Sequence, residues 1–298
     1  NPSADGVTGM DVAVLGAGSR GRTVTRRCVR AGHDVRLYDD DANTVMDSVD
    51  AVDRALSEVT GTDYITGTTG LASAVEGVDL VADTTDGGTD TRRELLAEIE
   101  TTVAEETLVA TGDTTVSVTA VAAGLRKPDR AVGLHFVDPA DSRLVEVVLA
   151  DQTAAETRER AIAFVEELDC VPIVVADTPG FASARLELAG IAEAIRAVEA
   201  GVASVPDVDR AATRDTERRG PLARADAMGL HTVRSGLEDL AARLGERFRP
   251  PDLLERAVAE GRLGRQSGAG FYVWSDGEPG APSHLVSDEA TPTDGPEG

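Results

Sequence analysis

The feature that most restricts the fold of this chain is a glycine-rich turn near its start. The segment V-A-V-L-G-A-G-S-R-G, residues 12–21, places G-x-G-x-x-G at Gly16, Gly18 and Gly21, directly after a predicted strand and at the start of a predicted helix. In this pattern the first glycine permits the tight turn, the second lets a pyrophosphate approach the backbone, and the third allows close helix–strand packing. The N–H groups and the dipole at the start of the helix attract phosphate.

A second predicted strand, residues 34–38, follows this helix and leads into Asp39. The acid lies about 20 residues beyond the glycines, where dinucleotide-binding domains carry the acid that binds the adenosine ribose. Its carboxylate repels a 2′-phosphate, so the sequence predicts NAD rather than NADP. Cofactor contacts are predicted at Gly16, Gly18, Ser19, Arg20, Gly21 and Asp39. Arg20, Arg22 and Arg26 could all reach phosphate, although a solvated helix face is the other interpretation. The alternative for the whole motif is a turn in another α/β protein, such as a methyltransferase.

Short aliphatic runs alternate with helical stretches through the first part of the chain. Several runs contain Val, Leu and Ala without strict alternation, which is typical of strands covered on both faces. The predicted strands are 11–15, 34–38, 79–83, 107–111, 131–135, 144–149 and 171–175. Among the predicted helices, 153–168 begins with a candidate capping box of Thr153 and Glu156. This alternation predicts an α/β fold with a doubly wound parallel sheet.

The pattern becomes almost wholly helical after Asp177-Thr-Pro-Gly-Phe181. Helices are predicted at 181–199, 206–214, 221–244 and 251–260. The first carries an apolar stripe, typical of a core or a dimer interface, formed by Leu186, Leu188, Ile191, Ile195 and Val198. The Pro179-Gly180 pair marks the domain boundary. The predicted organisation is a flexible N-terminus (1–9), a dinucleotide-binding domain (10–178), a helical domain (179–274) and a flexible acidic tail (275–298).

The net charge of the chain is strongly negative. There are 53 Asp and Glu against 29 Lys and Arg, a net charge of −24, and Lys127 is the single lysine. Such a surface repels phosphate backbones, so we expect neither nucleic acid nor an anionic membrane as a partner. The acids are spread along the sequence rather than gathered into one tail. This distribution favours adaptation to high salt over an acidic binding surface.

The cysteines and the apolar runs indicate the cellular compartment in which the protein is expected. Cys28 and Cys170 are the only cysteines and lack metal-ligand spacing. They predict neither a disulfide framework nor a zinc site, and they fit a reducing compartment. No apolar run reaches the roughly 18 residues that span a bilayer. Residues 1–10 lack the basic and apolar regions of a signal peptide. We therefore expect a cytoplasmic protein without a bound metal.

His135 is the histidine best placed for chemistry. It ends a predicted strand within Gly133-Leu-His-Phe-Val-Asp-Pro139, at the edge where α/β sheets bind ligands, and Glu146 follows on the next strand. An imidazole takes the proton of a substrate hydroxyl while hydride leaves for a nicotinamide, and a carboxylate fixes its tautomer and stabilises the imidazolium. The pair predicts a dehydrogenase, whereas a lone histidine at a strand end is more often structural.

From Asp11 to Trp274 the sequence resembles the 3-hydroxyacyl-CoA dehydrogenases, in particular the short-chain 3-hydroxybutyryl-CoA type. The matching segments are the glycine turn with Asp39, 133–139, L-V-E-V-V at 144–148, D-T-P-G-F at 177–181, Gly220-Pro221 with Asp226 and Gly229-Leu230, and 263–272. The resemblance implies a Rossmann domain followed by a helical domain that forms a homodimer, with NAD as cofactor and an acyl-CoA as substrate. It also implies that His135 is the general acid/base and Glu146 its partner. Thr114 takes the place of a serine that binds the substrate oxygen, and Arg92 keeps a basic residue of the family and is expected to bind the cofactor.

The chain departs from the family at several positions. The departures are Gly112 for asparagine, Gly87 for glutamate, Gln266 for lysine, and Ala184 for an asparagine that helps to bind the acyl thioester. Between Asp39 and Tyr64 only one helix fits, about 43–58, where relatives carry a longer hairpin that contacts CoA. The leading prediction is oxidation of an L-3-hydroxyacyl-CoA to the 3-oxoacyl-CoA with NAD. The alternatives are a dehydrogenase of a small 3-hydroxy acid without CoA, of the sugar-acid or carnitine type, and a non-catalytic NAD-binding protein.

Overall fold

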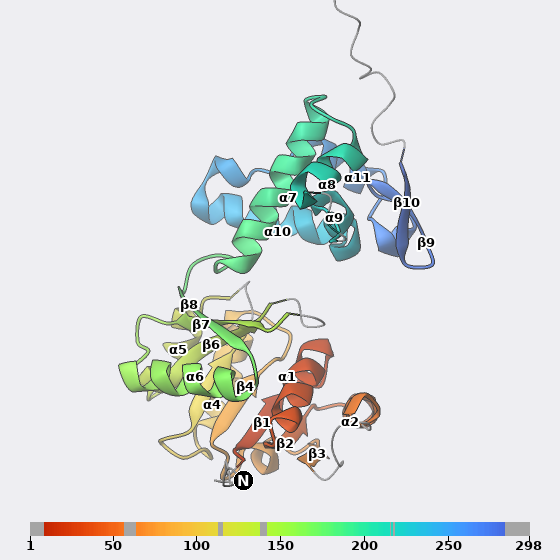
Figure 1. The fold of residues 1–298 in the computed structure, drawn as a ribbon. Helices are drawn as coiled ribbons and strands as arrows, with labels where there is room; N and C mark the ends of the chain where they lie inside the picture. Colours follow the sequence, from red (N-terminus) through yellow and green to blue (C-terminus); the bar gives the residue numbers. More distant parts are fainter. Residues whose placement is uncertain are drawn as a thin grey trace, which may run out of the picture. The chain divides into compact units, whose positions relative to one another are not determined.

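The computed structural model describes residues 9–56, 64–112, 116–137, 142–214, 216 and 218–283. The chain divides into two compact units, and the boundary falls between Ala182 and Ser183 (Figure 1). The first unit contains the glycine turn and the His135 strand, and the second contains the helical part of the sequence. The structural boundary therefore lies slightly beyond the Pro179-Gly180 pair.

The first unit is built on an eight-stranded sheet with the order β3-β2-β1-β4-β5-β6-β7-β8. The strands are β1 (Asp11–Leu15), β2 (Asp34–Tyr38), β3 (Ile65–Thr68), β4 (Leu80–Asp83), β5 (Leu108–Thr111), β6 (Ala131–Phe136), β7 (Leu144–Leu149) and β8 (Val171–Ala176). β1 to β6 pair in parallel, β7 is antiparallel to β6, and β8 is parallel to β7. The predicted parallel sheet is confirmed. β3 was not predicted, because this edge strand reads I-T-G-T and has no buried residue.

Helices cover both faces of this sheet. α1 (Ser19–Arg30), α2 (Ala42–Leu56) and α6 (Ala155–Glu167) pack on one face, and α3 (Leu71–Val75), α4 (Thr89–Ile99) and α5 (Val118–Ala122) pack on the other. Successive residues of a strand point to opposite faces. Leu80 and Ala82 of β4 therefore join the first core, and Val81 joins the second. Helices on both faces make the sheet doubly wound, as predicted.

The capping box predicted at the start of α6 is wrong. Ala154 precedes the helix, and no side chain in the described part of the chain caps it. The hydroxyl of Thr153 instead donates to the carbonyl of Ala131 at 2.7 Å and accepts the N–H of Ala150 at 2.9 Å. Thr153 therefore ties the β7–α6 turn to β6 rather than capping the helix.

The second unit is mainly helical. Its helices are α7 (Ser183–Glu199), α8 (Val205–Thr213), α9 (Pro221–Met228), α10 (Leu230–Leu244) and α11 (Asp252–Ala259). Most of the predicted apolar stripe of α7 is buried in the core of this unit, whereas Leu186 is 73% exposed. The helix predicted at 221–244 is broken at Gly229, whose φ of +95° lies outside the helical region. In the described part of the chain, no helix is long and apolar enough to cross a membrane.

The acidic tail was predicted to begin too early. β10 (Glu278–Pro282) pairs with β9 (Tyr272–Ser275) as an antiparallel hairpin. The fully buried carboxylate of Asp226 anchors the hairpin, since it accepts the N–H of Phe271 at 2.9 Å and the indole N–H of Trp274 at 2.9 Å. The composition of this segment, rich in Pro and Gly, gives no sign of so distant an anchor. The rest of the predicted tail, 284–298, and residues 1–8 of the predicted N-terminus lie outside the described residues.

His33 is a buried polar group that affects the stability of the first unit. Its side chain has no exposed surface, its Nδ1 accepts the N–H of Met10 at 3.1 Å, and its ring stacks on Phe164. Among the described residues its Nε2 has no hydrogen-bond partner, and Oε2 of Glu167 lies 3.9 Å away. Burial lowers the pKa of His33 below its ordinary value of 6.5, while the charges of Glu167 and Asp34 oppose the shift.

We expect His33→Gln to reduce the amount by which the free energy of unfolding falls between pH 7 and pH 5. A histidine whose pKa is lowered by folding stays neutral in the native state, while the unfolded chain takes up the proton. Its contribution to stability is therefore complete above pH 6.5 and is lost as the pH falls below that value. One proton accounts for a slope of at most about 1.4 kcal/mol per pH unit. Denaturant unfolding between pH 7 and pH 5 measures the slope. His231→Gln, at an exposed position of α10, is the control, and equal slopes for His33→Gln and the unsubstituted protein would contradict the expectation.

Candidate active site

The turn between β1 and α1 requires glycine at two of its three glycine positions. Gly16 has a φ of +97°, and a Cβ there would lie 2.9 Å from the backbone nitrogen of Thr85. A Cβ on Gly21 would lie 1.9 Å from the carbonyl oxygen of Gly16. Gly18 differs, because no described atom lies within 4 Å of its Cβ position and no side chain caps α1. The start of α1 therefore has open space beside the N–H groups of its first turn, which fits the pyrophosphate of a dinucleotide.

The peptide groups of Ala17, within this turn, are held by side chains from three elements. Its N–H donates to Oδ2 of Asp39 at 2.9 Å, at the end of β2. Its carbonyl accepts from Oγ of Ser48 on α2 at 2.6 Å and from Nη1 of Arg22 on α1 at 3.4 Å. Oδ1 of Asp39 accepts the N–H of Asp41 at 3.2 Å. Each carboxylate oxygen of Asp39 keeps a further lone pair, which is what a ribose hydroxyl needs.

Ser19 and Arg20 form the first turn of α1. Ser19 is exposed beside the open space at Gly18. Nη2 of Arg20 donates to Oδ1 of Asp86 at 2.6 Å and to the carbonyl of Thr85 at 3.3 Å. Arg20 and Arg22 are both partly exposed, and both are hydrogen-bonded within the unit. Arg20 connects the glycine turn to residues 84–88, the β4–α4 loop.

Arg92 occupies a position that differs from the one predicted. Its side chain has no exposed surface and pairs with the carboxylate of Asp83 at the end of β4. It also donates to the carbonyl of Gly87 at 3.3 Å. A buried guanidinium needs such an acid, because an uncompensated buried charge is strongly destabilising. The predicted contact between Arg92 and the cofactor does not fit a side chain enclosed in this way.

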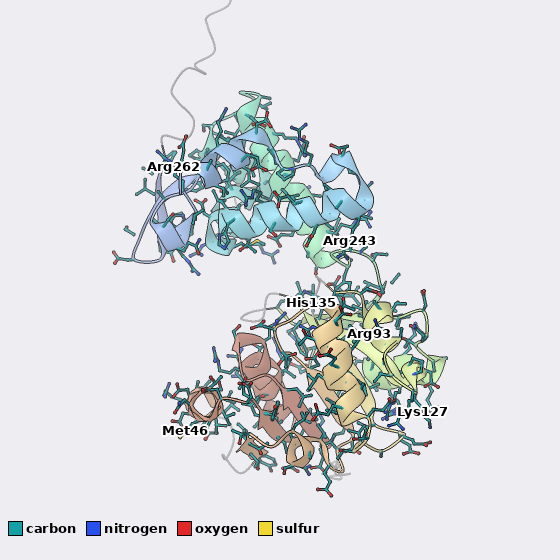
Figure 2. All side chains as sticks on the ribbon, turned by 180° about the vertical axis from the view of Figure 1, so that it is seen from behind. Met46, Arg93, Lys127, His135, Arg243 and Arg262 are labelled. Carbon is teal, nitrogen blue, oxygen red and sulfur yellow. The ribbon has the colours of Figure 1, made fainter. Side chains whose placement is uncertain are left out.

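His135 and Glu146 face each other across β6 and β7. The strands are antiparallel and their register pairs these two residues directly. Directly opposed residues lie on one face with Cβ atoms about 4.5–5.5 Å apart. Glu146 is fully buried, and its Oε1 accepts the N–H of Ala182 at 2.9 Å. Nδ1 of His135, which is labelled in Figure 2, lies 3.4 Å from the carbonyl oxygen of Gly112. Its ring centroid lies 5.9 Å from that of Phe181.

The glycine turn and the His135–Glu146 pair lie at the same edge of the sheet. β1, β2, β4, β5 and β6 are parallel, so their carboxyl ends share that edge. β7 runs the other way, which brings Glu146, near its start, to the same edge. The order of the sheet changes direction between β1 and β4, the switch point at which α/β sheets bind ligands. Thr114, the predicted contact of the substrate oxygen, lies outside the described residues.

Comparison with known families decides what kind of protein carries this site. Residues 11–178 match the family described as 3-hydroxyacyl-CoA dehydrogenase, NAD binding domain, and residues 180–274 match its C-terminal domain. The chain belongs to the 3-hydroxyacyl-CoA dehydrogenase family. It is an NAD-dependent oxidoreductase of that family, and the resemblance inferred from the sequence is confirmed.

Named relatives of this 3-hydroxyacyl-CoA dehydrogenase family member cover most of the chain. It is 29% identical over 285 residues to the mitochondrial hydroxyacyl-coenzyme A dehydrogenase of Sus scrofa, covering 88% of this chain and 90% of that one. It is 26% identical over 281 residues to the 3-hydroxybutyryl-CoA dehydrogenase of Clostridioides difficile, covering 89% and 100%. The crystal structure of (S)-3-hydroxybutyryl-CoA dehydrogenase from Ralstonia eutropha superposes with a TM-score of 0.83 at 29% identity, covering 90% and 100%.

Four polar residues near the site give little signal in the sequence, namely Ser48, Asp83, Thr84 and Thr111. Ser48 is one polar residue in a helix, and its contact with Ala17 spans 31 positions. Oγ1 of Thr84 donates to the carbonyl of Gly16 at 2.9 Å. Asp83 and Thr111 each end a predicted strand. A polar residue at the carboxyl end of a parallel strand is the signal that would have indicated them.

Proposed function

We propose that this protein oxidises a short-chain L-3-hydroxyacyl-CoA to the 3-oxoacyl-CoA with hydride transfer to NAD. The direct pairing of His135 with the buried Glu146, at the sheet edge that carries the glycine turn, is the observation that supports this reaction best. The names of the relatives support the substrate class, since one is a hydroxyacyl-coenzyme A dehydrogenase and two are 3-hydroxybutyryl-CoA dehydrogenases.

In the proposed reaction His135 removes the proton of the substrate's 3-hydroxyl group. A carbonyl oxygen can only accept a hydrogen bond, so Nδ1, which faces the carbonyl of Gly112, carries the ring hydrogen. Nε2 then keeps the lone pair that takes the proton. Bound NAD accepts the hydride from C3 of the substrate. The carboxylate of Glu146, held by the N–H of Ala182, stabilises the imidazolium that forms.

The other residues of the proposed site bind and orient. The backbone around Gly18 and Ser19 and the start of α1 receive the pyrophosphate, and Asp39 receives the adenosine ribose. Thr114 donates its hydroxyl hydrogen to the substrate oxygen, in the place of the family's serine. Residues 10–178 form the NAD-binding domain, and residues 179–274 form the substrate and dimerisation domain.

A dehydrogenase of a small 3-hydroxy acid without CoA is the second candidate. Ala184, in the first turn of α7, has no amide to hold a thioester oxygen. Gly87 has no side chain where the family has a glutamate. In the described residues between β2 and β3, α2 is a single helix that ends at Leu56, whereas a longer hairpin is expected in a CoA-binding relative. Ala184 and the single helix lack contacts that the resemblance implies for an acyl-CoA, and Gly87 lacks a glutamate that the resemblance places near the nicotinamide.

NADH consumption in concentrated KCl separates the two candidates. We expect turnover with acetoacetyl-CoA and none with acetoacetate at the same concentration. Turnover with the free acid alone would replace the first proposal with the second. Absence of both, in folded protein that binds NADH, would contradict both and indicate a non-catalytic NAD-binding protein.

We infer further that the protein is a cytoplasmic homodimer that works at high salt. The second unit leaves Leu186 and Val202 more than 70% exposed, which supports a subunit contact through its helices. Cys28 and Cys170 are free and buried, in keeping with a reducing compartment. The net charge of −24 supports solubility in concentrated salt. Sedimentation in concentrated and dilute KCl tests this inference, and a folded monomer in concentrated KCl would overturn the dimer.

A further inference from the structure

The glycine turn and the β4–α4 loop are joined to each other. Oγ1 of Thr84 donates to the carbonyl of Gly16 at 2.9 Å, and Nη2 of Arg20 donates to the carbonyl of Thr85 at 3.3 Å. A Cβ on Gly16 would come within 3.0 Å of backbone atoms of Thr84 and Thr85, so the two segments are in close contact. A displacement of the β4–α4 loop therefore disturbs the turn that binds the pyrophosphate.

The buried guanidinium of Arg92 is hydrogen-bonded to the β4–α4 loop. Nη2 of Arg92 donates to the carbonyl of Thr85 at 2.5 Å, and its Nε donates to the carbonyl of Gly87 at 3.3 Å. Nη1 donates to Oδ2 of Asp83 and to Oγ1 of Thr111 at 3.2 Å. Arg92 is 0% exposed and Asp83 is 1% exposed. A single side chain thus connects the ends of β4 and β5 with two carbonyls of the loop.

The carboxylate of Asp83 fixes the direction of that guanidinium. Its Oδ2 accepts from Arg92 and from the hydroxyl of Thr111 at 3.1 Å. Its Oδ1 accepts the N–H of Thr85 at 3.0 Å and the hydroxyl of Thr85 at 2.6 Å. Charge-assisted hydrogen bonds away from water are strong, and a buried network with its partners in place rigidifies its surroundings. The acid therefore holds both Arg92 and the start of the loop in one arrangement.

Gly87 gives the loop the backbone shape that Arg92 binds. Its φ of +140° is a conformation that L side chains rarely adopt. A Cβ there would also lie 3.2 Å from the side chain of Thr91. The glycine at this position, where the family has a glutamate, therefore permits the backbone conformation in which its carbonyl meets Nε of Arg92.

We propose that Arg92 is a positioning residue for NAD, which acts through the carbonyls of Thr85 and Gly87 and does not touch the dinucleotide. The ion pair with Asp83 keeps the β4–α4 loop against the glycine turn in the binding shape before NAD arrives. A loop that is ordered in advance costs less to bind than one that must be ordered on binding. Loss of these contacts therefore weakens NAD binding and leaves the proton transfer at His135 in place.

Arg92→Lys tests the proposal with little change to the charge of the site. An ammonium keeps a positive charge beside Asp83, but it lacks the planar fork that reaches the acid and both loop carbonyls together. We expect the Kd for NADH, measured by fluorescence titration, to rise about 10-fold. Arg93→Lys is the matched control, since Arg93 is the next residue of α4, partly exposed, and its Nη1 lies 3.9 Å from Asp90 (Figure 2). Its Kd for NADH should equal that of the unsubstituted protein.

Amide hydrogen exchange in NAD-free protein separates positioning from direct contact and from stability. Residues 84–88 should exchange faster in Arg92→Lys than in Arg93→Lys, and the pH profile of kcat should keep its shape. If Arg92 touched NAD directly, the affinity would fall without faster exchange, and the proposal would be overturned. A lower melting temperature with an unchanged Kd would also overturn it, because the ion pair would then serve stability alone. Thr111→Val removes the two hydrogen bonds of one hydroxyl, to Arg92 and to Asp83, and keeps the ion pair. It should weaken NADH binding in the same direction by a smaller factor, and an unchanged Kd in folded Thr111→Val and Arg92→Lys would refute the proposal.

Discussion

His135→Gln should lower kcat by about 10³-fold while it changes NADH affinity by less than about twofold. Glutamine has no group that accepts a proton near neutral pH, so the substrate hydroxyl loses its base. The proposed dinucleotide contacts depend on β1, β2 and the β4–α4 loop, which the substitution leaves in place. The effect should therefore fall on turnover and not on cofactor binding.

Two measurements on each protein check this expectation. Single-turnover oxidation of NADH with acetoacetyl-CoA gives the chemical rate, and fluorescence titration gives the Kd for NADH. His231→Gln is the matched control, because His231 lies at an exposed position of α10 in the second unit. Undiminished turnover in His135→Gln would remove His135 from the mechanism. Loss of NADH binding together with turnover would instead assign His135 to the integrity of the sheet edge.

The surroundings of Glu146 favour a role in orienting His135 over a role as a second base. It is fully buried and its Oε1 is bound to the N–H of Ala182, so it has no surface from which to reach a substrate directly. In the proposed reaction Glu146 therefore acts through His135, the residue that the register places opposite it. This dependence explains why neither residue alone identifies the site, whereas their pairing across β6 and β7 does.

Local backbone demands made much of the fold predictable from the sequence. The first glycine of the turn has a φ of +97°, and the third has no room for a Cβ. Because only glycine meets these demands, the residue types alone indicate the turn. The buried strands are short aliphatic runs, and β1, β2 and β7 begin and end where those runs do. β3 escaped prediction because an edge strand of Thr and Gly contributes little to a core. Where burial or backbone geometry restricts the residue type, the sequence pattern predicts the local structure.

Contacts between distant residues were not predictable in the same way. Asp226 binds backbone and indole N–H groups 45 to 48 positions later, and this anchoring makes a hairpin of a segment that looks like a tail. Arg92 carries the residue type of a cofactor contact at the expected position, yet Asp83, nine positions earlier, draws it into the interior. Ser48 reaches Ala17 from another element. A sequence pattern reports which face of an element is apolar, but it does not report which polar group lies opposite.

Asp39→Ala should weaken NAD binding by about 10²-fold and greatly reduce the preference for NAD over NADP. The substitution removes two contributions at once. The first is the negative charge that, in the proposed binding mode, accepts the ribose hydroxyls and repels a 2′-phosphate. The second is the acceptor for the N–H of Ala17, since Oδ2 of Asp39 holds that group at 2.9 Å. A freed N–H within the glycine turn leaves the turn less ordered, so the affinity for ADP, which carries the adenosine and the pyrophosphate without the nicotinamide riboside, should fall as well.

Asp39→Asn separates the two contributions. The amide oxygen still accepts the N–H of Ala17, so the turn stays ordered, while the negative charge is gone. Asp39→Asn should therefore relax the preference against NADP with a smaller loss of NAD affinity than Asp39→Ala, and the difference between the variants measures the ordering of the turn. Asp40→Asn removes the same charge at the next, exposed position and should change neither quantity. If all three variants kept the NAD preference of the unsubstituted protein, another group would hold the ribose. If Asn and Ala weakened NAD binding equally, the bond to Ala17 would contribute nothing to affinity.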